Sequence, residues 1–245
     1  MKKKIAVIIP CYNVKKRILS VINKIDLKIV NCIYIIDDFC PQHSGEFVNK
    51  SFKSKKIKVF NLKKNLGVGG ATIFGFAQAL KDNNEILIKI DGDGQHDPSQ
   101  IIDFINPMIS HDYNFCKGSR FHTITQLKKI PKMRLFGNFV LSFITKIITG
   151  FYNINDCVNG YIAIKSELFN KVRKMNINNR FFFEQDLLFY LSFHPTKIKE
   201  IPIKAKYFAN SSNLNILMII PSFIYYHFLN LLIKISHKFK LKKLN

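Results

Sequence analysis

The feature that most constrains the fold is a series of short, β-branched apolar runs that alternate with helix-length stretches. The runs lie at residues 5–9, 32–36, 56–62 and 86–90. Alternation of this kind predicts βαβ units, whose right-handed crossovers bring the strands into one parallel sheet. Ligands of open α/β sheets bind beyond the carboxyl ends of the strands. The residues that follow each run are therefore the first candidates for a site.

Polar or turn-forming residues follow all four runs. They are Pro10-Cys11-Tyr12-Asn13, Asp37-Asp38, Asn65-Leu66-Gly67 and Asp91-Gly92-Asp93. Since parallel strands end at the same edge of a sheet, these four segments are expected to meet. Their convergence indicates a ligand site more strongly than any one motif does.

Residues 65–75, NLGVGGATIFG, form a glycine-rich turn that opens a predicted helix. Gly67, Gly69 and Gly70 would let a ligand approach the backbone closely, and a helix start favours an anion. The segment lacks the GK[ST] of a P-loop, and its glycines are wrongly spaced for a dinucleotide fingerprint. Plain turn chemistry is the alternative to ligand contact.

The sequence ILIKIDGDGQHDP at residues 86–98 gathers oxygen ligands at the end of one predicted strand. It is not a calcium loop, because His96 stands where a glycine turn is needed and Ile102 replaces the bidentate glutamate. The pair Asp91 and Asp93, with Gln95 in reach, fits a Mg²⁺ or Mn²⁺ ion that completes its shell with water and substrate phosphates. We interpret His96 as a supporting or surface group.

The charge of the chain is strongly basic, with 38 Lys and Arg against 16 Asp and Glu and a formal charge of +22. No acidic residue lies between Asp112 and Asp156, and none follows Glu200. The same two segments are the most apolar amphipathic stretches, which favours an anionic membrane surface over nucleic acid as the partner. Generic solvated lysines are the alternative explanation. Five cysteines without a CxxC pair predict reduced thiols in a cytoplasmic protein.

A stripe of apolar residues at helical spacing follows in the basic middle segment: Phe136, Val140, Phe143, Ile147 and Phe151, with Ile144 and Ile148 widening it. Core packing is the default explanation of such a stripe. Contact with a membrane surface is the alternative, because the segment is basic and free of acids.

Residues 214–233 contain no Asp, Glu, Lys or Arg and would just span a bilayer. Pro221 interrupts them, and polar residues recur every four positions at Ser222, Tyr226, Asn230, Lys234 and Lys238. We therefore expect a helix in the membrane interface with lysines near the headgroups, namely Lys234, Lys238, Lys240, Lys242 and Lys243. Docking on the protein's own core is the alternative.

Seven motifs occur in order over about residues 4–208: VIIPCYN, IIDD, NLGVGGA, DGDGQHDP, GSRF, NDCVNGY and FFFEQD. As an ordered set they resemble family 2 glycosyltransferases of the GT-A fold, and more narrowly the bacterial branch that looks like dolichyl- or polyprenyl-phosphate sugar synthases. The resemblance implies an α/β fold with a Rossmann-like, mostly parallel sheet flanked by helices. It implies a GT-A domain over residues 1–210, and we expect the basic amphipathic C-terminal helix over residues 211–245.

By that resemblance, Pro10, Tyr12 and Asp38 would line the nucleotide base pocket, and Asp91 would face the ribose or diphosphate. Asp93 with Gln95, beside Asp91, would hold the cation. The full donor-binding set that the resemblance implies is Pro10, Tyr12, Asn13, Asp38, Asn65, Gly67 and Asp91. The chain departs from the family at Phe39-Cys40, where members often carry Gly-Ser after the two aspartates.

The resemblance also implies a catalytic and an acceptor side. Arg120 would meet phosphate charge, and Glu184 or Asp186 would be the base for a hydroxyl acceptor, whereas an anionic lipid phosphate needs no base. Two carboxylates at a solvated helix start are the alternative. The acceptor side would comprise Asp156, Asn159, Gly160 and Tyr161. The DCVNGY motif there differs from the corresponding segment of familiar dolichyl-phosphate synthases.

These patterns predict a cytoplasmic enzyme, peripheral on the inner face of the plasma membrane. As the family resemblance implies, it would move a sugar, with inversion, from a UDP- or GDP-sugar to a polyprenyl phosphate or a lipid-linked or cell-surface glycan. A sugar-phosphate nucleotidylyltransferase is an alternative, although its basic, glycine-rich phosphate loop is missing after Ile9. A basic nucleic-acid-binding module is another. No nucleic-acid partner is expected, because the positive charge is almost all lysine and no recognised motif is present.

Overall fold

The structure is a computed structural model that describes residues 3–128, 130–206 and 216–242, without the side chains of residues 216–220 and 237–242. The predicted domain boundary between residues 210 and 211 lies outside the described residues. The same holds for Lys243, one of the lysines expected near the headgroups. The sheet has seven strands: β1 (Ile5–Cys11), β2 (Cys32–Asp37), β3 (Ile57–Asn61), β4 (Ile86–Lys89), β5 (Phe115–Ser119), β6 (Ile162–Lys165) and β7 (Ile198–Pro202). Their order is β3-β2-β1-β4-β6-β5-β7. Only β6 pairs antiparallel with its neighbours among these described strands, so the predicted mostly parallel sheet is confirmed.

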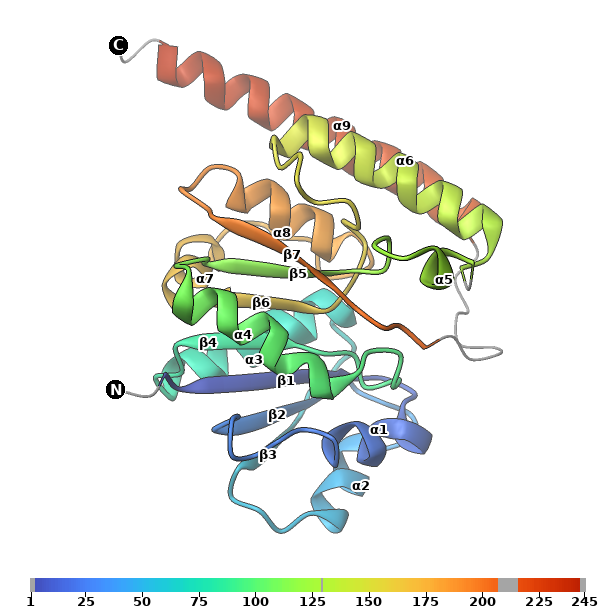
Figure 1. Cartoon of the computed structure of the whole chain (residues 1–245), viewed down its shortest axis with the longest axis vertical. Helices are drawn as coiled ribbons and strands as arrows, with labels where there is room; N and C mark the ends of the chain where they lie inside the picture. The colour runs from blue at the N-terminus through green and yellow to red at the C-terminus, as the bar shows by residue number, and fades with distance from the viewer. Residues whose placement is uncertain (1–2, 129, 207–215, 243–245) are drawn as a thin grey trace.

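Helices cover both faces of this sheet (Figure 1). The elements between β1 and β5 are α1 (Lys15–Ile22), α2 (Ser44–Ser51), α3 (Gly67–Lys81), η1 (Pro98–Gln100) and α4 (Ile101–Ser110). Those that follow are α5 (Ile124–Leu127), α6 (Lys132–Thr149), α7 (Ser166–Val172), α8 (Phe183–Leu191) and α9 (Ile216–Lys242). One core cluster packs α1, α2 and α4 on one face of the sheet, and a second packs α3, α7 and α8 on the other.

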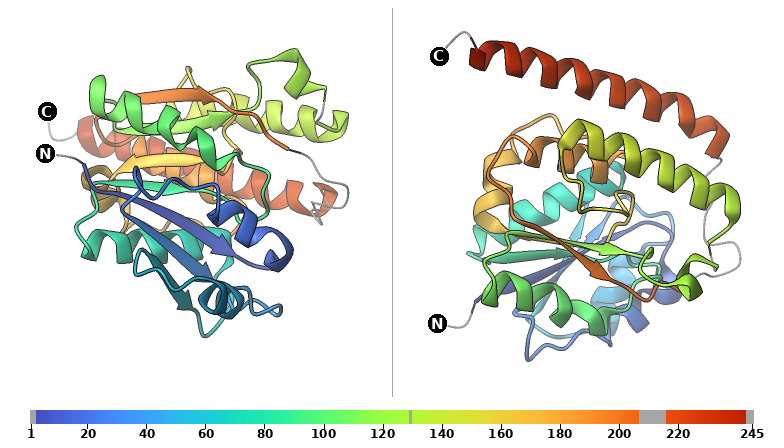
Figure 2. Two further views of the ribbon diagram at one scale, coloured as in Figure 1. Left: turned by 60° about the horizontal axis from the view of Figure 1, so that its bottom comes forward. Right: turned by 45° about the horizontal axis from the view of Figure 1, so that its top comes forward.

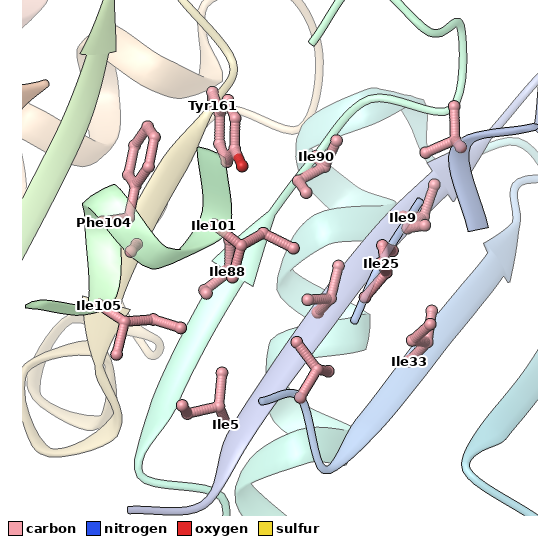
Figure 3. Packing of buried hydrophobic residues seen from close by; sticks show 14 of the residues in the cluster. Ile5, Ile9, Ile25, Ile33, Ile88, Ile90, Ile101, Phe104, Ile105 and Tyr161 are labelled. Atoms are coloured by element: carbon pink, nitrogen blue, oxygen red, sulfur yellow. The ribbon is translucent and has the colours of Figure 1, made fainter. Parts of the chain in front are cut away.

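Alternate residues of the central strands enter different core clusters. Ile5, Val7 and Ile9 of β1 pack in the first cluster, and Ala6 and Ile8 pack in the second. Figure 3 shows part of the first cluster, with side chains of the strands beside those of α4. Burial on both faces explains why these strands read as unbroken apolar runs in the sequence.

Strand β1 continues two residues past the predicted end at Ile9. Its pairing with β4 stops at Ile8, whereas its pairing with β2 continues to Cys11. Pro10 therefore lies where one side of the strand has no ladder partner. A proline is tolerated in a strand at such a position, because it has no N–H to donate.

Helices α6 and α9 lie side by side beyond α8 (Figures 1 and 2). Core packing is wrong as the explanation of four residues of the predicted α6 stripe, because they are between 41% and 67% exposed: Phe136, Val140, Phe143 and Ile147. Phe151, which follows the helix, is partly buried against the second core cluster. Within the described residues we find no helix that combines the length and apolarity needed to cross a membrane.

Candidate active site

The carboxyl ends of β1, β2 and β4 meet the start of α3 at one edge of the sheet. Asp38, directly after β2, accepts hydrogen bonds from the backbone N–H groups of Leu66 and Gly67 at 2.7 and 2.9 Å. Asn65 donates its side-chain amide to the Asp38 carbonyl at 3.1 Å. The structure thus brings together Asp38, Asn65 and Gly67, with the aspartate holding the glycine-rich turn against the strand end. Burial raises the pKa of Asp38 despite these bonds.

Two features of the structure require residue 67 to be a glycine. Its φ is +81°, in the left-handed region that favours glycine. A Cβ at this position would lie 2.5 Å from the Asn179 carbonyl oxygen. The helix start therefore packs directly on the segment that precedes α8.

Two aromatic rings are exposed at the ends of the neighbouring strands β1 and β2. Tyr12 is 50% exposed and Phe39 is 62% exposed. Asn13 and Phe39 both have left-handed backbones, with φ values of 58° and 55°, and the Asn13 N–H lies 3.1 Å from Cys40 Sγ. A bulky residue with positive φ is unusual, and such strain concentrates at functional sites. Pro10, in contrast, is buried within β1.

A buried lysine fixes Asp91 at the end of β4. Lys89 Nζ lies 2.9 Å from Asp91 Oδ1 and 3.0 Å from Glu184 Oε1, and the lysine side chain is only 1% exposed. Burial alone would lower the pKa of Lys89, but the charges of Asp91 and Glu184 outweigh it and raise that pKa. Lys89 in turn outweighs burial at Asp91 and lowers the pKa of this carboxyl. The three groups form a charged chain between β4 and α8.

The backbone at Gly160 passes directly over this chain of charges. A Cβ there would lie 2.5 Å from Lys89 Nζ and 2.7 Å from Asp91 Oδ2. Any side chain at this position would displace the ion pair. The absence of a side chain at Gly160 therefore leaves room for the ion pair between Lys89 and Asp91.

Asp93 and Gln95 are in direct contact, as the sequence suggested. Gln95 donates its backbone N–H to Asp93 Oδ1 at 2.9 Å and its side-chain amide to Oδ2 at 2.6 Å. Burial, and then the charge of Asp91, raise the pKa of Asp93. His96 is buried, and burial lowers its pKa to about 4. Its Nδ1 accepts the Asp91 N–H at 3.4 Å, which is a supporting contact.

The carboxylates of Asp91 and Asp93 fit a cation that takes few ligands from the protein. Among the residues that the structure describes, no group of three or more His, Cys, Asp and Glu side chains could hold a metal. Asp91 and Asp93 leave two carboxylates at the rim of the sheet, and Asp91 retains 32% exposure. Magnesium and manganese are commonly bound by one or two carboxylates, with water and substrate phosphates completing the shell.

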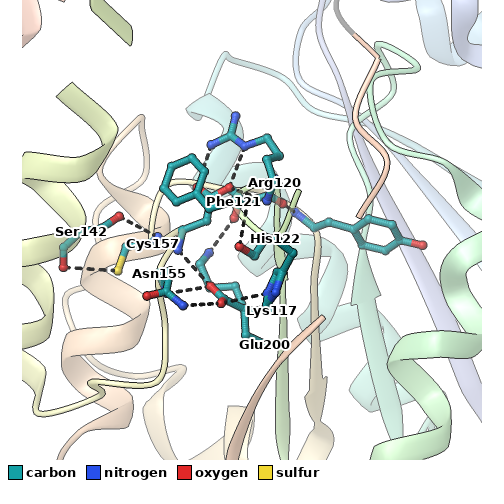
Figure 4. A network of polar contacts seen from close by, with 12 residues as sticks. Lys117, Arg120, Phe121, His122, Ser142, Asn155, Cys157 and Glu200 are labelled. Carbon is teal, nitrogen blue, oxygen red and sulfur yellow. Dashed lines mark hydrogen bonds and ion pairs between the residues drawn. The ribbon is translucent and has the colours of Figure 1, made fainter. Parts of the chain in front are cut away.

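The acceptor-side residues have internal partners. Arg120 makes a bidentate ion pair with Asp156, whose two oxygens each lie 2.7 Å from the guanidinium, and both side chains are buried. The expected contact of Arg120 with a ligand phosphate therefore competes with this pair. The Asp156 N–H donates to Glu200 at 2.9 Å. Figure 4 shows this network around Arg120 and Glu200.

Asn159 and Tyr161 also face inward. The Asn159 side chain accepts the Tyr161 N–H at 2.8 Å, and its carbonyl accepts Lys117 Nζ at 2.5 Å. The Tyr161 ring stacks on Phe104 with ring centroids 4.1 Å apart. Both residues hold the segment that carries Gly160 in place, rather than presenting side chains at the surface.

The two predicted base candidates differ in their partners. Glu184 pairs with Lys89, whereas Asp186 accepts the Asn178 N–H at 2.7 Å and the Asn230 side-chain amide of α9 at 2.9 Å. Both carboxylates are buried, so their interpretation as a solvated helix start is wrong. Burial raises the pKa of Asp186 despite its two hydrogen bonds.

Sequence reasoning missed the buried cations Lys89 and Lys117. Burial lowers the pKa of Lys117, and Glu184 opposes that effect. Each lysine lies within a strand, at ILIK in β4 and FCKGS in β5. A cation inside an otherwise buried run was the available signal, because a buried charge requires a partner.

The fold and this site define an α/β enzyme of the GT-A class that uses a nucleotide-sugar. The model of Glycosyl transferase family 2 matches residues 6–173, and the chain belongs to that family. It is a glycosyltransferase. Membership of this family argues against a sugar-phosphate nucleotidylyltransferase and against a nucleic-acid-binding module. The expected resemblance to polyprenyl-phosphate sugar synthases is confirmed by its relatives.

Two relatives illustrate that likeness. The UDP-N-acetylglucosamine–dolichyl-phosphate N-acetylglucosaminyltransferase of Methanococcus voltae is 28% identical over 218 residues, which cover 84% of this chain and 86% of the relative. The undecaprenyl-phosphate mannosyltransferase of Micrococcus luteus is 24% identical over 203 residues, which cover 82% of each chain.

A solved structure shares the fold. Glucosyl-3-phosphoglycerate synthase from Mycobacterium tuberculosis, in complex with Mn²⁺, UDP and glucosyl-3-phosphoglycerate, superposes with a TM-score of 0.66 at 16% identity. The match covers 95% of this chain and 80% of that one.

Proposed function

We propose that this enzyme transfers one sugar from a nucleotide diphosphate to a polyprenyl phosphate, with inversion at the anomeric carbon. The observation that carries the proposal is the site at the carboxyl edge: Asp91 and Asp93 follow β4, and Lys89 joins Asp91 to Glu184 of α8. The glycine-rich start of α3 packs on the segment that precedes the same helix α8. The names of the Methanococcus and Micrococcus relatives support a lipid-phosphate acceptor.

The donor would lie across the edge of the sheet. Tyr12 offers an exposed ring for the base. Asp38 holds the glycine-rich start of α3 in place by accepting the N–H groups of Leu66 and Gly67. Lys89 keeps Asp91 ionised and fixed in orientation. Groups that are already in place need no reorganisation as charge develops.

Asp93 and Asp91, with Gln95 beside them, would hold Mg²⁺ or Mn²⁺, and the Mn²⁺ and UDP of the Mycobacterium structure support this assignment. When bound, the cation would stabilise the negative charge on the departing nucleotide diphosphate. Asp93 is well suited to the role, because the neutral Gln95 donates two hydrogen bonds that orient its carboxylate.

The partners of Glu184 and Asp186 support a phosphate acceptor over a hydroxyl acceptor. Glu184 neutralises a buried lysine, and Asp186 is bonded to Asn178 and Asn230. Recruiting either carboxylate as a base would break one of these contacts. A phosphate oxygen is already anionic and needs no base.

We place the enzyme at the inner face of the plasma membrane as a peripheral protein, where a lipid-linked acceptor and a nucleotide-sugar both occur. Five buried free thiols support a reducing compartment. The net charge of +22 supports attraction to anionic lipid.

The test is a transfer assay with purified enzyme, UDP- and GDP-sugars, and polyprenyl phosphate, with and without Mn²⁺ or Mg²⁺. We expect sugar-linked lipid and released nucleoside diphosphate only when a cation is present. Asp93→Ala should abolish turnover while Asp97→Ala, a matched change at an aspartate that caps η1, retains it. Pyrophosphate release from a nucleoside triphosphate, or full turnover by Asp93→Ala, would contradict the proposal.

A further inference from the structure

Helix α6 is amphipathic, but its polar side faces the protein and its apolar side faces outward. Its buried face is mostly polar: Asn138, Ser142, Thr145 and Thr149 are buried there beside one apolar residue, Ile148. Its outward face is apolar, and six of its large apolar side chains are between 41% and 71% exposed: Met133, Phe136, Phe139, Val140, Phe143 and Ile147. A helix that folded only to complete a soluble core would have the opposite arrangement.

Helix α9 repeats this arrangement beside it. Part of the polar line that the sequence shows is turned inward, since Asn230 is buried and Tyr226 stacks on Phe182 with centroids 5.2 Å apart, whereas Ser222 is exposed. His227, beside this line, is also buried. Lys234 bonds the Ile148 carbonyl of α6 and ties the two helices together. The exposed large apolar side chains described for α9 are Ile224, Tyr225, Phe228, Leu229, Leu231, Leu232 and Ile235.

The two outward faces belong to neighbouring helices, as all the views in Figures 1 and 2 show. We name this combined surface the α6–α9 face; its residues are the exposed apolar side chains of α6 and α9 given above. Soluble monomers rarely expose an apolar patch made of so many large residues. Such a patch indicates that the α6–α9 face binds an apolar partner.

Charge identifies the kind of partner. All the charged residues of α6 and α9 are basic: Lys132, Arg134 and Lys146 on α6, and Lys234, Lys238, Lys240 and Lys242 on α9. A second copy of this chain would bring the same positive charge against itself. A bilayer that contains anionic lipid offers both an apolar interior and negative headgroups.

The inner sides of the same helices reach the acceptor side of the site. Ser142 of α6 accepts the Cys157 N–H at 3.1 Å, next to Asp156. Asn230 of α9 donates to Asp186 at 2.9 Å, two residues from Glu184. The inner sides of α6 and α9 therefore contact the segments expected to receive the acceptor, and their outer sides form the apolar face.

We infer that the α6–α9 face seats the enzyme on an anionic bilayer, with the apolar rings in the acyl boundary and the acceptor segments above them. Neither helix needs to cross the membrane for this arrangement. The inference rests on the proposed function in one respect only, the lipid nature of the acceptor.

The experiment is co-sedimentation of the full chain with two kinds of vesicle, phosphatidylcholine alone and equimolar phosphatidylcholine and phosphatidylglycerol. We expect strong binding to the anionic vesicles only. Phe136→Gln/Phe143→Gln should weaken that binding by about 30-fold or more, since two large rings lose their burial in lipid. Both rings are about two-thirds exposed, at 67% and 64%, so the variant should fold normally.

The matched control is Ile109→Gln/Met175→Gln, which removes one exposed apolar side chain from α4 and one from the turn that follows α7. It should bind vesicles like the wild type. Wild-type protein that stays in the supernatant with both vesicles would overturn the inference, as would equal binding by the Phe136→Gln/Phe143→Gln variant. A wild-type dimer that this variant converts to a monomer, with unchanged vesicle binding, would overturn it as well and assign the face to a second copy.

Transfer assays separate this inference from the proposed function. The Phe136→Gln/Phe143→Gln variant should transfer sugar normally to polyprenyl phosphate in detergent and poorly to the same acceptor in anionic vesicles. Loss of transfer in both settings would assign the rings to catalysis and overturn a purely membrane role. Vesicle binding without any transfer by the wild type would refute the proposed function and leave the membrane face supported.

Discussion

The buried charged chain from Asp91 through Lys89 to Glu184 yields a quantitative prediction for Lys89→Met. Methionine fills a similar space but removes the cation that both carboxylates face at 2.9 and 3.0 Å. The Glu184 carboxylate would then be buried without its cation and poorly hydrated, since its side chain is only 8% exposed. We expect the variant to fold with reduced stability and to lose most of its turnover, because Asp91 loses the group that orients it.

The magnitude follows from the burial of the pair. Removing one partner of a buried ion pair costs about 3–5 kcal/mol. The lower end applies here, because Asp91 is one-third exposed and water can replace part of its lost partner. A loss of about 3 kcal/mol lowers Tm by roughly 6–12 °C in a chain of this size. Replacing both partners by apolar groups is close to neutral, so Lys89→Met/Glu184→Leu should recover about 2 kcal/mol.

Urea unfolding followed by circular dichroism measures these differences. Lys58→Met is the matched control, because Lys58 pairs with Asp82 at 2.7 Å on the surface, where both side chains are about 40% exposed. Its cost should stay below about 1 kcal/mol. Equal small costs for Lys89→Met and Lys58→Met would refute the reasoning, and so would a double variant less stable than Lys89→Met.

Three further predictions concern other parts of the structure. Asp156→Asn should cost about 3–5 kcal/mol in urea unfolding, because it leaves the Arg120 guanidinium buried without its counter-charge; a change below 1 kcal/mol would contradict this. Gly160→Ala should lower kcat at least about tenfold, since a Cβ would lie 2.5 Å from Lys89 Nζ; wild-type kcat would show that the site tolerates the displacement. Burial lowers the pKa of His227 from 6.5 to about 4. Its contribution to stability is therefore complete above about pH 6.5 and is lost as the pH falls toward 4. The Tm of His227→Leu should fall less than that of the wild type over this range, and parallel curves would exclude the histidine as the cause.

The fold on the amino-terminal side was predictable because β1, β2 and β4 are buried on both faces and therefore appear as mostly apolar runs, whereas the edge strand β3 is only partly buried. Strands β5 and β7 contain interior charged or glycine residues, such as Lys117 and Gly118 in β5, so no comparable run marks them. The antiparallel β6 could not be inferred from an alternation that fades after residue 112.

The candidate site was predictable only where its residues are close in sequence. The contact of Asp93 with Gln95 spans two residues and follows from the DGDGQ spacing. Lys89 and Glu184 are 95 residues apart, and their ion pair depends on how α8 packs on the sheet. The orientation of α6 was likewise hidden, because periodicity identifies an apolar face without showing which way it points.

The central claim is that the acceptor is a phosphate that attacks without a protein base. The most direct test compares polyprenyl phosphate with the corresponding unphosphorylated polyprenol, using the same nucleotide-sugar donor, and determines the anomeric configuration of the product by NMR. We predict transfer to the phosphate alone, with inversion relative to the donor. Equal transfer to the free alcohol, or a product that retains the donor's configuration, would contradict the account.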